Sequence, residues 1–209
     1  MNKNLTMTLT LSAIALFLAG CSSNVDAAKG ASENITGDLS DIQEEFVDLQ
    51  KEEQSLQALF NETLEQDENF ETLADNSSAV FENITARMES IEELKGKQGE
   101  LEEEFTALND LEADGLPADL FEETKSQLDE SAKALDAFIT HYSENLNQQS
   151  DYFQSLASED ASYETFTEGI RSINEQQEAL YEKFTALDIA FSSLNETNQA
   201  FDDALNEDK

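Results

Sequence analysis

The amino-acid sequence predicts an all-α protein, an elongated antiparallel helical bundle of about four long helices with coiled-coil-like packing. Apolar residues recur at steps of three and four along most of the chain, as on helices that pack side by side. No segment keeps the period of two that a half-buried strand requires. Apolar residues make up 39% of the 209 residues, including 13 Phe, which is enough to bury a core despite a formal net charge of −36.

Four apolar runs give the expected helices in order. They cover residues 35–60, 81–108, 121–156 and 166–205. Helices of about 30–40 residues are about 45–60 Å long, and only antiparallel partners can cover faces of that length. An extended homodimeric coiled coil is the alternative, but short connections near residues 75, 115 and 160 favour a chain that folds back. Gln177 and Asn198 interrupt the last run, and we expect them to fix helix register rather than to form a small hydrated site.

Helix-breaking and helix-capping residues stand between these runs. Residues 75–78, Asp-Asn-Ser-Ser, supply caps for the second helix. Gly115 ends that helix, and Pro117 suits the first turn of the third. Residues 158–162 separate the third helix from the fourth. The helical domain is therefore expected over residues 39–207.

Residues 1–20 have the layout of a signal peptide, with a short basic start and an apolar segment too short to span a membrane. Leu18, Ala19 and Gly20 precede Cys21 and resemble a bacterial lipobox. This resemblance implies cleavage before Cys21 and a lipid anchor attached to its thiol; an ordinary secreted protein or a buried structural Cys is the alternative. Residues 21–38 offer little to bury, which predicts a lipidated Cys followed by a flexible tether.

The composition excludes several functional classes. One Cys and one His cannot form a Cys/His zinc module or a disulfide. With 47 acidic against 11 basic residues, the chain lacks a surface for nucleic acid. The motif Asp110-x-Glu112-x-Asp114-Gly115 resembles the start of an EF-hand, but the twelfth position is Phe121 rather than Glu. We therefore expect an interhelical turn there, no metal site and no cofactor beyond weak, non-specific divalent cations.

The candidate catalytic groups also favour a structural interpretation. His141 and Glu144 have the reverse order of the di-iron motif, and one His cannot supply its pair, so a solvent-facing histidine is expected. Acidic clusters at residues 44–45, 52–53 and 102–104 fit solvated helix faces better than the desolvated carboxylates of a glycosidase. Nucleophile and phosphate-loop motifs are absent from the sequence. We expect no enzyme and no small-molecule substrate.

Cys21 together with two stretches near the third break resembles a known family. Residues 151–156 read Asp-Tyr-Phe-Gln-Ser-Leu, and residues 166–174 read Phe-Thr-Glu-Gly-Ile-Arg-Ser-Ile-Asn. This pattern is similar to the YkyA-like cell-wall-binding lipoproteins of Gram-positive bacteria. The resemblance implies an extracytoplasmic lipoprotein that faces the wall, with no catalytic residues to carry over. The scarcity of Lys departs from the family, and an anionic wall would then be contacted through divalent cations, hydrogen bonds or aromatic side chains.

These observations predict a non-catalytic lipoprotein of the cell envelope, anchored at the outer face of the membrane, that binds the cell wall (peptidoglycan) or acts as a scaffold or spacer. The alternative is a protein-protein binding module for another envelope protein. An exposed apolar patch would mark that alternative. The sequence offers Phe70, Leu73, Val80 and Tyr163 as its candidates, because they lie outside the apolar seams.

Overall fold

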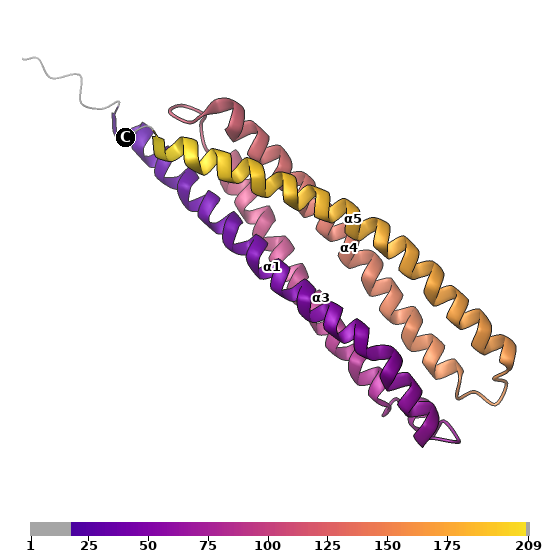
Figure 1. Cartoon of the computed structure of the whole chain (residues 1–209). Coiled ribbons are helices and arrows are strands. Elements are labelled where there is room, and N and C mark those ends of the chain that lie inside the picture. Colours follow the sequence, from indigo (N-terminus) through magenta and orange to yellow (C-terminus); the bar gives the residue numbers. More distant parts are fainter. Residues whose placement is uncertain (1–17, 208–209) are drawn as a thin grey trace, which may run out of the picture.

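The computed structural model describes residues 18–207, which form helices and contain no strand (Figure 1). The all-α prediction is confirmed, and the four apolar runs correspond to the four long helices. A short helix in the first connection was not predicted. In chain order, the helices are α1 (Leu18–Gln66), α2 (Glu71–Ala74), α3 (Ala79–Asn109), α4 (Ala118–Ser155) and α5 (Tyr163–Glu207).

The four long helices run antiparallel along one rod (Figure 1). α1 packs along α3, α3 along α4 and α4 along α5, whereas direct contact between α1 and α5 is much less extensive. The start of α1 and the end of α5 lie together at what we call the proximal end (Figure 1). At the opposite, distal end, Phe153 of α4 packs against Phe60 of α1 and Phe81 of α3. A helix of the length of α1 measures about 70 Å.

The core repeats the spacing of seven that predicts left-handed, coiled-coil-like packing. Leucines seven residues apart are fully buried on α3, α4 and α5, and phenylalanines fill the space between these layers. The leucines are Leu94, Leu101 and Leu108 on α3, Leu128 and Leu135 on α4, and Leu187 and Leu194 on α5.

Three connections join the helices where turn residues were predicted. Gly115 adopts a φ of 82°, which an L side chain rarely does, and Pro117 occupies the N-cap of α4. Ser162 and Thr165 cap the start of α5 reciprocally, each side chain accepting from the other residue's backbone N–H. Ser78 takes the N-cap position of α3, but its hydroxyl bonds Thr63 at 2.7 Å instead of the helix end.

The predicted flexible tether over residues 21–38 is wrong, because this segment is part of α1. Ala28 and Ile35 are completely buried, and Ala31 and Ser32 are nearly so. These small residues at helical spacing form a narrow stripe that packs closely on the neighbouring helices. Alanine and serine carry little apolar surface, so the spacing of large apolar residues does not reveal this stripe. The helical bundle therefore begins with α1 rather than at residue 39.

Candidate functional site

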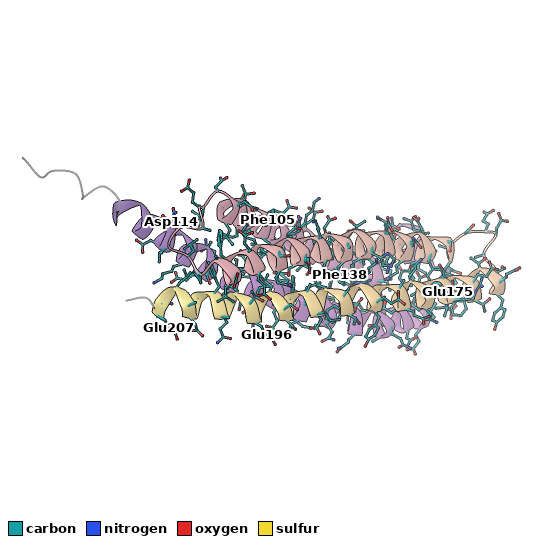
Figure 2. The ribbon with its side chains drawn as sticks, turned by 90° about the horizontal axis from the view of Figure 1, so that it is seen from above. Phe105, Asp114, Phe138, Glu175, Glu196 and Glu207 are labelled. Atoms are coloured by element: carbon teal, nitrogen blue, oxygen red, sulfur yellow. The ribbon has the colours of Figure 1, made fainter. Side chains whose placement is uncertain are left out.

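An open groove with a volume of about 800 Å³ lies between α1 and α5. We call it the α1–α5 groove. Phe138 and Tyr142 of α4, both buried, form its floor. Phe138 lies midway along the rod (Figure 2). The apolar side chains of the two walls are Leu39, Ile42, Phe46, Val47 and Leu49 from α1 and Leu180, Tyr181, Phe184, Leu187 and Phe191 from α5.

Two features account for the opening. Near the proximal end, Asn198 of α5 donates hydrogen bonds to the Ser32 carbonyl at 2.9 Å and to the Thr36 hydroxyl at 3.1 Å, and these bonds hold α5 close to α1. Farther along, large rings separate the two helices. The Phe46 ring centroid lies 5.0 Å from that of Phe138 and 5.6 Å from that of Phe184, both in edge-to-face geometry. The three rings fill the floor but leave the space above them open.

Exposed apolar side chains gather on the two helices that border the groove. Every large apolar residue that is exposed in the described part of the chain belongs to α1 or α5, and none belongs to α3 or α4. Val47 is 61% exposed and Tyr181 is 72% exposed, and these two side chains face the groove from opposite walls. The complete set is Val47, Leu64, Tyr163, Ile170, Tyr181, Phe184 and Ile189.

The distal end of the groove is polar. Here the buried Tyr142 hydroxyl donates a hydrogen bond to Glu53 Oε1 at 2.9 Å. Burial raises the pKa of Tyr142 far above its usual value, and the nearby Arg87 only partly opposes this shift. Behind Tyr142, Arg87 donates to Gln149 Oε1 at 2.8 Å and is almost completely buried. The groove thus combines an aromatic floor with a hydrogen-bonded carboxylate.

The charge of the groove has one sign. Glu53 and Asp188 are its charged lining residues, and no Lys, Arg or His side chain lines it. Amide and hydroxyl side chains supply the other polar lining of both walls, among them Gln43, Ser40, Gln177 and Ser192. The predicted seam residue Gln177 is exposed on the groove, whereas Asn198 bonds α1 as a register residue would.

A smaller hollow of about 590 Å³ lies between α4 and α5 near the distal end. Tyr152 packs on Gly169 here, where a side chain would overlap the tyrosine ring. Burial raises the pKa of Tyr152 to about 12, and its hydroxyl donates to the Phe166 carbonyl at 3.4 Å. The lining is mainly hydroxyl, amide and carboxylate groups that face solvent.

An ionic cluster joins α1 to α3 on another face. Lys97 lies 2.7 Å from Asp41 and 2.8 Å from Glu100. Asp38 lies beside Glu100, and its side chain is only 13% exposed. Burial, a hydrogen bond with Glu100 and repulsion from the Glu100 charge together raise the pKa of Asp38 to about 6, although Lys97 opposes the shift. The geometry is that of a structural ion pair with a partly desolvated carboxyl group.

The predicted lipobox and the EF-hand-like residues can be located in the helices and turns of the structure. Leu18, Ala19, Gly20 and Cys21 lie in the first turns of α1. Residues 1–17, and with them most of the predicted signal peptide, lie outside the described residues. The EF-hand-like residues 110–115 form the turn after α3. Within the described part of the chain, no three His, Cys, Asp or Glu side chains come together as a metal site.

Two other predictions are wrong. His141 is half-buried rather than solvent-facing, and its Nε2 is buried without a hydrogen-bond partner. The proposed apolar patch does not form, because Leu73 and Val80 are core residues while Tyr163 is exposed. The apolar surface that is exposed was not predicted, because Phe46 and Phe184 have the spacing of buried seam residues. Its signal was present in Val47 and Tyr181, apolar residues that fall outside that seam.

One comparison with known proteins places this chain. A family model, YkyA, described as "Putative cell-wall binding lipoprotein", matches residues 25–204. The chain belongs to this family. Neither the curated proteins nor the solved structures gave a match.

The match to the YkyA family begins within α1 and ends within α5, so it includes α3, α4 and every residue that lines the groove. The family description names a lipoprotein, which implies attachment to a membrane of the cell envelope. Among residues 18–207, no helix combines the length and apolar character needed to cross a bilayer.

Proposed function

We propose that this protein is a non-catalytic lipoprotein held on the outer face of the membrane by a lipid on Cys21, and that it binds the cell wall as a rigid spacer. The position of Cys21 carries the proposal. Cys21 follows the lipobox residues Leu18, Ala19 and Gly20 and lies in the first turns of α1. A lipid at this position would attach the proximal end of the rod to the membrane.

The rod accounts for the spacer role. α1 runs from the anchor region to the distal end as one continuous helix of about 70 Å. The distal connections, residues 67–78 and 156–162, would therefore stand well clear of the lipid headgroups. Two or three acyl chains would hold the chain firmly, since each buried methylene contributes about 0.8 kcal/mol.

Charge limits how the wall can be contacted. A net charge of −36 opposes direct approach to anionic wall polymers. Divalent cations that bridge surface carboxylates to the wall would overcome this repulsion. Hydrogen bonds and aromatic side chains on the outer helix faces would be a second, uncharged means of contact.

Co-sedimentation with purified cell-wall sacculi tests wall binding. Residues 22–209 suit this assay because they contain every buried core residue, from Ala28 to Leu205. We expect pelleting at physiological salt with millimolar calcium or magnesium, and loss of pelleting with a chelator. Absence of the protein from the pellet with and without cations would rule out the wall role. In cells, loss of palmitate labelling in Cys21→Ser would test the anchor separately.

The groove favours a second role, the binding of another envelope protein. Its apolar side chains are exposed on two helices, whereas both other long helices keep their large apolar residues covered. Contact between these apolar side chains and water is unfavourable, and a partner protein that covered them would remove this cost.

A further inference from the structure

We infer that the α1–α5 groove binds an amphipathic helix of another envelope protein, with an apolar stripe flanked by Lys or Arg residues. The inference deepens the second role above, and it does not depend on wall binding. Its basis is the combined length, apolar lining and charge of the groove.

The groove has the length of a helix. Its lining runs from Thr36 to Glu53 on α1 and from Gln177 to Asn195 on α5. At 1.5 Å per residue, each wall extends about 25 Å, which matches a partner helix of about 17 residues. The wall residues recur at steps of three and four, so they present ridges and grooves into which another helix can pack.

The apolar lining fits an apolar stripe better than a polar ligand. Val47 and Tyr181 are exposed on opposite walls, and Phe184, on the same wall as Tyr181, is 43% exposed. The floor beneath is closed by Phe138. Anchors spaced at i, i+3, i+4 and i+7 on a partner helix would reach these side chains in turn. Covering them removes apolar surface from water, which drives association.

Charge selects the kind of helix and excludes other occupants. Glu53 and Asp188 line the groove without any basic side chain. A partner with Lys or Arg beside its stripe would neutralise them and would be steered by the field of the whole chain. A second copy of this protein also has a net charge of −36 and is repelled. An anionic glycan strand is repelled for the same reason.

The test measures binding of a labelled helical peptide to residues 22–209 by fluorescence anisotropy. The peptide has about 18 residues, Leu at the stripe positions and Lys on both flanks, and a second peptide has Glu in place of Lys. We expect the Lys peptide to bind one chain at one site. The Glu peptide should bind at least about tenfold more weakly.

Matched variants locate the site. Val47→Ser with Tyr181→Ser removes one aliphatic and one aromatic residue from the groove. Ile189→Ser with Tyr163→Ser removes a similar pair outside it, since these residues are 62% and 83% exposed and do not line the groove. The groove pair should weaken Lys-peptide binding by about tenfold or more, and the control pair by less than about twofold. Circular dichroism confirms that both variants stay folded.

Four results would overturn the inference. Equal binding of the Lys peptide to both variants would mean attraction by general acidity alone. Failure of wild type to bind this peptide would exclude a helix site of this chemistry. Sedimentation that shows a dimer lost only in the groove variant would assign the groove to a second copy. Competition by soluble glycan fragments would assign it to the wall. Pelleting with sacculi, measured on the same variants, reports wall binding independently.

Discussion

Arg87 is almost completely buried in the core of a strongly acidic chain, and its neighbours explain how a guanidinium group is accommodated there. Its Nη2 donates to Gln149, and its charge lies close enough to the Tyr142 hydroxyl to affect the pKa of that group. Tyr142 in turn donates to Glu53. These contacts connect α3, α4 and α1 in one polar layer beneath the distal end of the groove. The negative field of the chain also favours a cation at this position.

Replacing Arg87 by Ala should therefore be strongly destabilising. The variant leaves Gln149 without its partner and creates a cavity, which together cost about 3 kcal/mol of unfolding free energy. Urea denaturation measures the loss. Arg171→Ala is the matched control, because that side chain is 69% exposed and its pair with Glu175 is long, at 4.0 Å. The control should change stability by less than about 0.5 kcal/mol. Equal effects of the two substitutions would contradict this role for Arg87.

Asp38 predicts a pH dependence of stability. Its pKa is raised to about 6 in the folded protein from 3.8, so the folded state binds a proton more readily than the unfolded state between these values. The contribution of Asp38 to stability therefore falls as the pH rises from about 4 to about 6. Asp38→Asn imitates the protonated carboxyl group. We expect it to raise the melting temperature at pH 7.5 and to have a much smaller effect at pH 4.

Asp41→Asn provides the control for this prediction. Asp41 also contacts Lys97, at 2.7 Å, but its side chain is 55% exposed. Removal of its charge should bring no stabilisation at pH 7.5, because an ion pair is lost and little desolvation is relieved. If Asp38→Asn and Asp41→Asn had the same pH profile, a general reduction of negative charge would explain both.

At the scale of helices, the sequence pattern was sufficient where large apolar residues mark the core. Apolar residues at steps of three and four located α3, α4 and α5, because large side chains at these positions are buried in the core. The start of α1 was not predictable in this way. Ala28, Ala31 and Ser32 are small, and Gly30 and Gly37 disfavour helices by about 1 kcal/mol each. Packing against neighbouring helices overrides this intrinsic preference, and such packing is not visible in one segment of sequence.

The glycines of the helices allow a direct test, because the same substitution should have opposite effects in two places. A Cβ atom at Gly37 of α1 would meet nothing within 4 Å. Gly37→Ala should thus raise the unfolding free energy by about 0.5–1 kcal/mol, through better helix propensity and a more restricted unfolded chain. Gly169→Ala on α5 should lower it, because the methyl group overlaps the Tyr152 ring. Thermal and urea denaturation measure both. A loss of stability in Gly37→Ala would mean that this part of α1 is not helical in solution.

The candidate site shows a different limit of sequence analysis. Phe46 and Phe184 were predicted to lie in the apolar seams of the first and fourth helices, but a seam does not reveal how many neighbouring helices cover it. Coverage depends on how α1 and α5 are spaced, which the ring cluster and Asn198 decide together. The groove therefore became apparent only from the arrangement of all four long helices.

Across the whole molecule, negative charge opposes the compact state. With a net charge of −36 along one narrow rod, carboxylates on adjacent helix faces repel one another. Glu45 illustrates the effect, since burial and four nearby carboxylates raise its pKa. Salt screens such repulsion over a Debye length of about 8–10 Å at physiological strength.

The melting temperature of residues 22–209 should consequently rise between about 10 mM and 1 M NaCl. Millimolar magnesium should give a similar rise, because divalent cations associate with clustered carboxylates. Differential scanning calorimetry measures both series. Sucrose, which stabilises by exclusion from the protein surface without screening charge, is the control. A melting temperature that stays constant across the NaCl series would contradict a major role for self-repulsion.

The continuity of α1 has a mechanical consequence. Between Leu18 and Gln66 the helix contains no break, so the chain has no slack segment next to Cys21. If Cys21 carries the proposed lipid, a pull on the distal turns would pass along hydrogen-bonded backbone directly to that anchor instead of first extending a coil. The protein would then behave as a lever whose fulcrum is the bilayer surface. A force on its distal end would tilt the whole rod and would pull on the membrane at the anchor.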